Sequence, residues 1–185
     1  LLIVNNIAQS NEAIRAKIMS SRYIRYEHDY LSNYFSNGTI DGIFSNAQAS
    51  IFLSPLHKQK HEIYTSSKPT FFVNSPIQTS LFKKGKKNGK YMWAGELVKH
   101  KGIENVIQFA KDNPDKQVVF YGWTGYDGDK YLKIIENIDN CTYKGSLDYK
   151  DMPNTMSVYT GFIHLPEWDE PFGRAVMEAY LSGCK

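Results

Sequence analysis

Short apolar runs alternate with segments of helical periodicity along most of the chain. We predict a strand for each of eight runs: Leu1–Val4, Tyr23–Glu27, Gly42–Ser45, Thr70–Asn74, Tyr91–Ala94, Gln117–Tyr121, Cys141–Lys144 and Gly161–Leu165. The spacing of apolar residues between them predicts six helices: Asn11–Ile18, Ala47–Lys60, Gly102–Asp112, Asp129–Asn137, Lys150–Tyr159 and Gly173–Ser182. Strands that alternate with helices are typical of parallel sheets, so the pattern predicts an α/β fold.

The alternation stops at one segment, which we interpret as a linker. Residues 76–90 hold Pro76, two glycines and five lysines: Lys83, Lys84, Lys86, Lys87 and Lys90. The sequence therefore predicts an α/β unit over 1–75 and a second one over 91–185. The lysines also suit peripheral contact with an anionic membrane surface. Nucleic acid is not expected as a partner, because no aromatic side chain stands among the lysines to stack on bases.

Composition and charge exclude several classes of protein. With 42% hydrophobic and 22% charged residues in a chain of 185, the sequence can form a core and is not a disordered protein. The net charge of +3 is small for a dedicated nucleic-acid binder. Two cysteines exclude a disulfide scaffold, and no apolar run approaches the roughly 20 residues of a membrane-spanning helix. We expect a cytoplasmic protein, and we expect the chain to be part of a longer one.

The segment Leu165–Glu178 carries the densest set of candidate functional residues. It leaves a predicted strand, crosses a polar loop and enters a helix near Gly173. Ligands of open parallel sheets bind at this carboxyl edge, and the first amides of a helix suit a phosphate. Arg174 lies in the first helical turn, where its charge opposes the helix dipole unless an anion binds there. Arg174 and Glu178 also share one helix face, so an ordinary i, i+4 ion pair is the competing interpretation.

A second strand–loop–helix connection follows Tyr91–Ala94. The chain leaves this strand through Gly95, crosses a loop with Lys99 and Lys101, and enters the amphipathic helix predicted for Gly102–Asp112. A lysine just before a helix N-terminus can reach a phosphate oxygen. The segment has no Gly-x-Gly-x-x-Gly fingerprint, which argues against a nicotinamide-dependent oxidoreductase.

Together these segments resemble glycosyltransferase family 4, a class of retaining enzymes with the GT-B fold. Glu170–Glu178, which reads Glu-Pro-Phe-Gly-Arg-Ala-Val-Met-Glu, is similar to the family's Glu-x7-Glu motif. Gly95–Gly102 resembles its glycine loop ending in Lys-Gly, Phe72–Phe82 its interdomain linker, and Tyr26–Asp29 its segment with an acceptor-side histidine. The resemblance covers nearly the whole chain and implies two Rossmann-like units, both incomplete here.

The resemblance also implies an activity and a set of site residues. A sugar would pass from a nucleotide-diphosphate donor to a hydroxyl of a carbohydrate or lipid-linked acceptor, with retention of configuration and without a metal or other cofactor. The implied catalytic residues are Glu170, facing the donor sugar, and His28, contacting the sugar or acceptor from the first unit. Lys101 and Arg174 would stabilise the leaving diphosphate. The backbone amides of Phe172 and Gly173 would assist them, and Glu178 would hold the ribose. This implied donor site consists of Lys101, Arg174, Glu178, Phe172, Gly173 and Gly95.

One position departs from the family pattern. The family's loop usually carries Arg directly after its glycine, whereas this chain has Glu96 there. Because a carboxylate repels a diphosphate, we expect Glu96 to point away, or Lys99 and Arg174 to supply the missing charge. The departure motivates an alternative function, a non-catalytic nucleotide-sugar-binding or scaffold domain.

Two other groups of residues could suggest a metal site. Asp127-Gly-Asp129 has the form of an Asp-x-Asp site, but it precedes a predicted helix, so we expect Asp129 to be an N-cap. His57, His61 and His100 lack zinc-ligand spacing with either cysteine. We therefore expect no metal.

Overall fold

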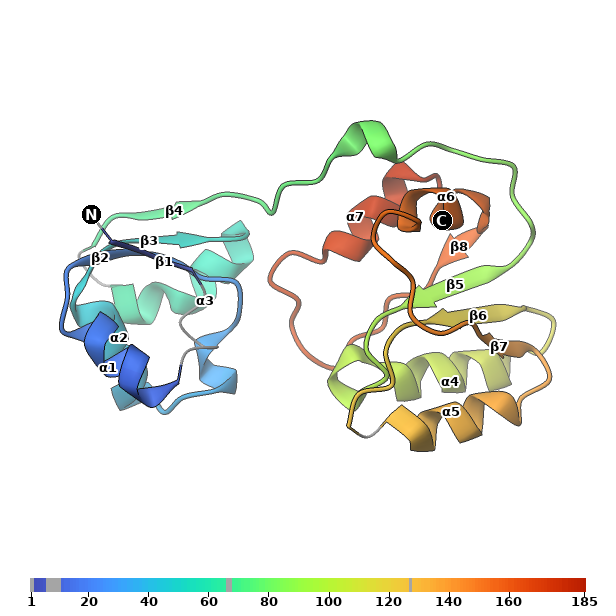
Figure 1. The fold of residues 1–185 in the computed structure, drawn as a ribbon, viewed down its shortest axis with the longest axis horizontal. Coiled ribbons are helices and arrows are strands. Elements are labelled where there is room, and N and C mark those ends of the chain that lie inside the picture. The colour runs from blue at the N-terminus through green and yellow to red at the C-terminus, as the bar shows by residue number, and fades with distance from the viewer. Residues whose placement is uncertain (1, 6–10, 66–67, 127) are drawn as a thin grey trace. The chain divides into compact units, whose positions relative to one another are not determined.

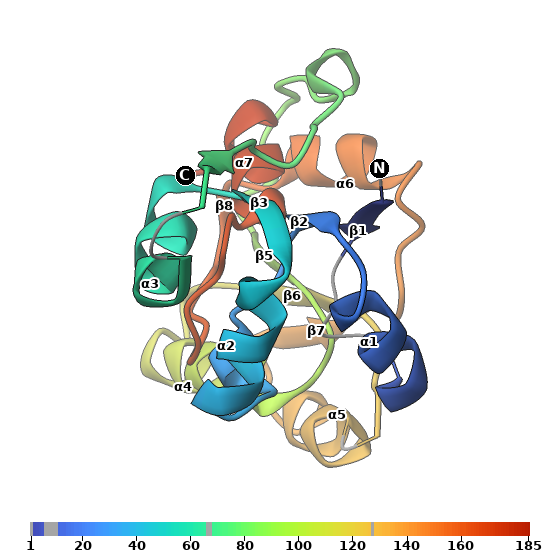
Figure 2. The ribbon, with the colours of Figure 1, turned by 90° about the vertical axis from the view of Figure 1, so that its left-hand side faces the viewer.

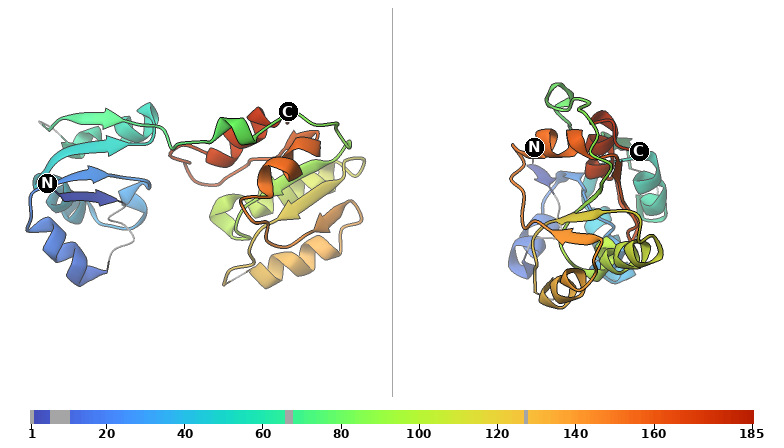
Figure 3. Two further views of the ribbon diagram at one scale, coloured as in Figure 1. Left: turned by 45° about the horizontal axis from the view of Figure 1, so that its top comes forward. Right: turned by 90° about the vertical axis from the view of Figure 1, so that its right-hand side faces the viewer.

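The computed structural model describes residues 2–5, 11–65, 68–126 and 128–185 (Figure 1). The chain divides into two compact units, Leu1–Pro76 and Ile77–Lys185. Each unit contains one four-stranded, all-parallel sheet (Figure 3). The α/β class predicted from the alternation of strands and helices is therefore confirmed.

The first unit has its strands in sequence order, β1 (Leu2–Asn5), β2 (Tyr23–Tyr26), β3 (Ala47–Phe52) and β4 (Thr70–Phe72). Three helices cover one face of this sheet: α1 (Glu12–Met19), α2 (Asn37–Ser45) and α3 (Pro55–Thr65) (Figures 1 and 2). A short 3-10 helix, Leu31–Asn33, follows β2. The core between sheet and helices consists of Val4, Tyr23, Leu31, Ile40, Ile43, Phe44, Ala47 and Phe52.

Two predictions in this unit were wrong. The run Gly42–Ser45 was predicted as a strand but ends helix α2, whose buried residues are Ile40, Ile43 and Phe44. Their i, i+3, i+4 spacing is helical, and it extends beyond the short run on which the strand prediction depended. The helix predicted over Ala47–Lys60 is instead strand β3 followed by α3, which begins at Pro55 because proline fits the first turn of a helix and not its interior.

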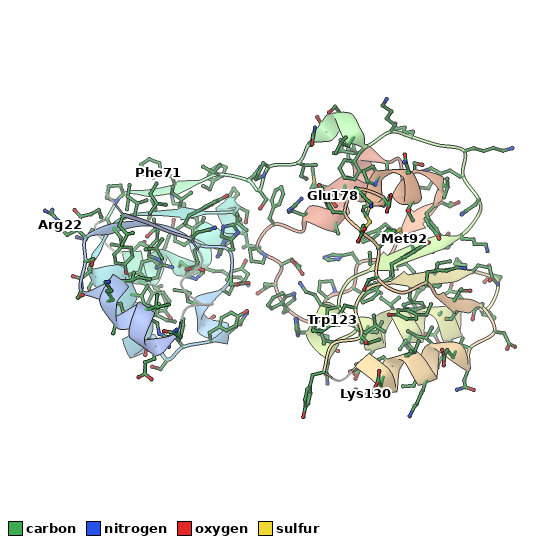
Figure 4. All side chains as sticks on the ribbon, viewed as in Figure 1. Arg22, Phe71, Met92, Trp123, Lys130 and Glu178 are labelled. Atoms are coloured by element: carbon green, nitrogen blue, oxygen red, sulfur yellow. The ribbon has the colours of Figure 1, made fainter. Side chains whose placement is uncertain are left out.

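The second unit has the strand order β7-β6-β5-β8, with β5 (Tyr91–Ala94), β6 (Val118–Tyr121), β7 (Cys141–Tyr143) and β8 (Gly161–Phe162). Successive strand residues point to opposite faces. Thus Trp93 and Phe120 pack under α4 (Ile103–Asp112) and α5 (Gly128–Glu136). Met92 and Val119 pack under α6 (Met152–Val158) and α7 (Arg174–Leu181). Helices therefore cover both faces of this sheet (Figures 1 and 4).

The segment predicted as a linker packs largely on the second unit. Phe82, which follows the 3-10 helix Thr79–Leu81, is buried in the core beside α6 and α7. Lys87 donates hydrogen bonds from Nζ to the carbonyl oxygens of Ser157 at 2.9 Å and Ser182 at 2.8 Å. The other four lysines of the segment are exposed. Among the described helices, none combines the length and apolar character needed to cross a membrane.

Candidate functional site

The loops after β5 and β8 meet at the carboxyl edge of the second sheet. Asn105 donates from Nδ2 to the Leu165 carbonyl at 3.0 Å, and the Glu167 amide donates to the His100 carbonyl at 3.2 Å. Gly102 adopts a left-handed conformation with φ 77°, and a Cβ there would lie 1.8 Å from the Leu165 oxygen. Glycine is required at this position for both reasons. The two candidate segments found in the sequence are therefore held against each other.

An ion pair joins these two loops. Lys101, in the 3-10 turn Lys99–Lys101, donates from Nζ to Oε1 of Glu170 at 2.8 Å. Trp168 donates from its indole nitrogen to the same oxygen at 3.0 Å. The Lys101 ammonium also lies 4.4 Å from the centre of the Trp168 ring, within the range of a cation–π interaction. Lys101 and Glu170, which the resemblance assigned separately to diphosphate and sugar, are thus direct partners.

The surroundings of Glu170 favour its ionised form. Burial by itself would raise the pKa of this carboxyl, but the hydrogen bond and charge of Lys101, the Trp168 indole and the nearby His164 together lower it. Burial lowers the pKa of His164; Glu170 opposes that shift, and Lys101 adds to it. Both shifts favour a Glu170 carboxylate beside a neutral His164 imidazole at neutral pH.

A second polar cluster surrounds Glu178 on α7 (Figure 4). The Glu178 side chain is almost fully buried, and its Oε1 accepts hydrogen bonds from the Tyr149 hydroxyl at 3.1 Å and from Arg174 at 3.3 Å. Arg174 also donates to the Tyr149 hydroxyl at 3.0 Å. The i, i+4 ion pair weighed as the competing interpretation is therefore present, and Arg174 remains half exposed. Its guanidinium can still contact a ligand.

The N-terminus of α7 is open to an anion. Gly173 precedes the helix in a left-handed conformation with φ 71°, and no side chain caps the helix. Within the described part of the chain, the amides of Phe172, Gly173, Arg174 and Ala175 donate no hydrogen bond. Unpaired amides at a helix N-terminus, with the positive end of the helix dipole, attract phosphate.

A cleft of about 250 Å³ lies at the carboxyl ends of β5 and β6. Its lining residues are Ala94, Gly95, Glu96, Tyr121, Gly122, Trp123, Ser146, Leu147 and Met152. The Gly95 amide donates to the Tyr121 carbonyl at 3.0 Å, so Gly95 lines the cleft with its amide already paired. The Glu96 carboxylate lies against the turn at Gly125, where an added Cβ would be 2.6 Å from its Oε1.

Residues 77–184 match the family model for glycosyl transferases group 1. The match covers more than half of the chain and contains both polar clusters. The chain belongs to this family. No curated protein sequence matches it significantly.

Solved glycosyltransferase structures share the fold. Anabaena HepE in complex with UDP and glucose superposes with a TM-score of 0.74 at 19% identity, over 93% of this chain and 54% of HepE. Sucrose-phosphate synthase from Thermosynechococcus elongatus superposes with a TM-score of 0.73 at 17% identity, over 88% of this chain and 49% of the synthase. Pneumococcal O-GlcNAc transferase GtfA superposes with a TM-score of 0.65 at 20% identity, over 98% of this chain and 40% of GtfA. The GT-B prediction is thereby confirmed, and the chain spans about half, or less, of the length of these enzymes.

The predicted acceptor-side histidine of this glycosyl transferase chain belongs to the first unit. His28 follows β2, and its ring lies 4.5 Å from that of Tyr26. Its Nε2 is buried and has no hydrogen-bond partner among the described residues. Burial lowers the pKa of His28, and the charge of Asp29 opposes this shift. The catalytic role of His28 stays a prediction.

The residues considered for a metal site are arranged differently from expectation. Asp127 lies outside the described residues, and Asp129 is inside the first turn of α5 instead of at its N-cap. His57 and His61 are direct neighbours on α3, with ring centres 4.9 Å apart. Over the described ranges, no group of three His, Cys, Asp or Glu side chains could hold a metal ion. Metal independence stays a prediction.

Sequence reasoning missed two residues of the site. Trp168 and Tyr149 contact the charged groups directly, but each is one of many aromatic residues in the sequence. Tyr149 precedes Glu178 by 29 positions, so no local spacing connects them. Trp168 stands two residues before Glu170, and this proximity was the only available signal.

Proposed function

We propose that this chain is part of a retaining glycosyltransferase, which transfers a sugar from a nucleotide-diphosphate donor to an acceptor hydroxyl during glycan or glycolipid assembly. One observation carries the proposal. Lys101 follows β5, and Arg174 and the unpaired amides at the start of α7 follow its parallel neighbour β8, so all of them belong to the carboxyl side of one sheet within the family-matched residues. These are the groups that a pyrophosphate needs. The complexes of HepE with UDP and glucose and with UDP-glucose support a nucleotide sugar as the donor.

The chemistry follows from where charge develops. As the bond between the anomeric carbon and the diphosphate breaks, negative charge grows on the leaving phosphate and positive charge on the sugar ring. Lys101 and Arg174 would stabilise the former, because fixed cations at a leaving group act most strongly in the transition state. The Glu170 carboxylate would face the sugar, and Glu178 would accept hydrogen bonds from the ribose hydroxyls. His28 would contact the sugar or the acceptor.

Calorimetry with the full-length protein and a panel of UDP-, GDP- and ADP-sugars tests the proposal. We expect one nucleotide to bind, with unchanged affinity in the presence of a chelator. Incubation of that donor with a carbohydrate acceptor should then give a product with the donor's anomeric configuration, which NMR identifies. Failure of every donor to bind would refute the proposal, and loss of binding in chelator would refute its metal independence.

A second candidate is a nucleotide-sugar-binding domain without turnover. Glu96 supports it, because this residue lines the cleft at the end of β5, where the family usually has an arginine. Binding of a donor without hydrolysis or transfer, in the full-length protein, would favour this candidate. Restored turnover in Glu96→Arg would show that the single charge causes the difference.

A further inference from the structure

Trp168 contacts both charged members of the ion pair at once. Its indole nitrogen and the Lys101 ammonium donate to the same atom, Oε1 of Glu170, at 3.0 Å and 2.8 Å. Its ring face lies 4.4 Å from that ammonium. The His100 ring lies 4.7 Å from the Trp168 ring and borders the group. The Trp168 side chain therefore restrains both Lys101 and Glu170 and contacts His100 of the loop after β5.

We propose that Trp168 is a positioning residue of the donor site, which holds Lys101 and Glu170 in the arrangement that a bound pyrophosphate and sugar require. This inference rests on the proposed function of the two charged residues. A lysine has a long flexible side chain, and its ammonium is a point charge without a preferred direction. The aromatic face restricts where that charge can lie.

The indole has a second role when a donor binds. In the proposed donor complex, a pyrophosphate at the start of α7 would compete with Glu170 for the Lys101 ammonium. If Lys101 turns toward the phosphate, the indole still donates to Oε1 and keeps the carboxylate oriented toward the sugar. An ionised carboxylate that loses its partners in a partly buried site becomes easier to protonate, and the Trp168 hydrogen bond opposes this change.

The location of Trp168 argues against a purely structural role. Among the described residues, Trp168 is not a member of any of the three apolar cores. It lies in the polar loop between β8 and α7, and its polar contact is with the predicted catalytic carboxylate. Its removal should therefore leave the fold intact and change the charged pair.

Three variants of the full-length protein separate the contributions. Trp168→Phe keeps an aromatic face and removes the indole donor, whereas Trp168→Leu removes both. Glu167→Gln is the matched control. It changes the charge of the same loop, and the exposed Glu167 side chain makes no described contact. Carbon-13 NMR of the glutamate carboxyls measures the Glu170 titration without any donor. The groups that face Glu170 are Lys101, Trp168 and His164, so a parallel titration of His164 shows whether its charge contributes.

We expect the pKa of Glu170 to rise in both Trp168 variants and to stay unchanged in Glu167→Gln. UDP-glucose binding should weaken about threefold in Trp168→Phe and about tenfold in Trp168→Leu, with native circular dichroism throughout. An unchanged Glu170 titration in Trp168→Leu would overturn the inference. If the wild type bound no nucleotide sugar but the Glu170 titration still shifted, the positioning of the pair would stand and the proposed function would fail.

Discussion

One ion pair in each unit shows two different uses of charge. The first unit buries an ion pair, Arg25 and Glu27, at 2.8 Å with each side chain 1% exposed. In the second unit, one ion pair lies at the sheet edge, where Lys101 and Glu170 are 31% and 21% exposed. A buried pair has no access to an outside partner, whereas a partly exposed one can exchange its partner for a ligand. The exposed fraction of an ion pair therefore distinguishes a polar network that stabilises the fold from one that can bind a ligand.

The buried histidines of the first unit show what such a network fixes. His57 donates from Nε2 to the Asp29 carbonyl at 3.0 Å and accepts the Leu53 amide at Nδ1. His61 donates from Nδ1 to the His57 carbonyl and accepts the Leu31 amide at Nε2. All four ring nitrogens are used, with both rings neutral. Two of these bonds hold the loop that follows His28, so the network stabilises the surroundings of the predicted acceptor-side residue.

The largest expected effect comes from breaking the buried pair. Glu27→Ala leaves the Arg25 guanidinium buried without its carboxylate partner, and we expect it to lower the free energy of unfolding by about 3–5 kcal/mol. Urea denaturation monitored by circular dichroism measures this change. Arg22→Ala is the control, because this exposed arginine makes one described side-chain hydrogen bond and should cost less than about 0.5 kcal/mol.

A double variant sharpens the interpretation. Arg25→Met with Glu27→Leu replaces both charges by apolar groups of similar size, which is often neutral or stabilising at buried ion pairs. A small loss in the double variant beside a large loss in Glu27→Ala would identify the unpaired charge as the cause. Equal losses would show that the pair itself stabilises the unit.

The contrast between the units also explains what the sequence could predict. The strands and helices of the second unit lie within a few residues of their predicted ranges. Its core is almost entirely apolar, so apolar periodicity identifies its elements correctly. In the first unit the apolar pattern was misleading, because β3 buries a polar residue, Ser50, and the short run at the end of α2 was interpreted without Ile40. The candidate site residues were predicted from a motif, but the contact between Lys101 and Glu170 was not, because these residues are 69 positions apart. Only the fold brings them together.

Removal of the partly exposed Lys101 ammonium should affect function instead of stability. In the full-length enzyme we expect Lys101→Ala to lower turnover by roughly 10²–10³, because the leaving diphosphate loses a fixed positive charge. Lys111→Ala is the control, because Lys111 lies in the last turn of α4, at the opposite end of the helix from Lys101. This variant should keep normal turnover. Turnover close to wild type in Lys101→Ala would remove this lysine from the mechanism and weaken the contrast between the units.

The buried histidines predict a pH dependence of the first unit. Burial lowers the pKa of His57 and of His61 from 6.5 to about 4, while hydrogen bonds to backbone carbonyls oppose the shift. Around and between pH 6.5 and 4 the unfolded chain therefore binds more protons than the folded one, so stability falls as the pH falls and is nearly constant above pH 7.5. From pH 7.5 to 5 we expect a loss of about 2 kcal/mol for each histidine. Urea denaturation at several pH values measures the slope, and His61→Gln should remove about half of it. An unchanged slope in that variant would contradict the assignment.

The smallest expected effect concerns Tyr149, which belongs to the half-exposed network of the second unit. Tyr149→Phe removes a hydroxyl that donates to Glu178 and accepts from Arg174, while the ring remains under the guanidinium. Because Tyr149 is itself exposed, its hydroxyl contributes about 1 kcal/mol, so we expect donor affinity to fall about fivefold and the melting temperature to change little. Calorimetry with the best-bound nucleotide sugar measures the affinity, and Tyr126→Phe, at a fully exposed tyrosine, is the control. A large loss of stability with unchanged affinity would mean that this network, like the buried one of the first unit, fixes structure and does not bind.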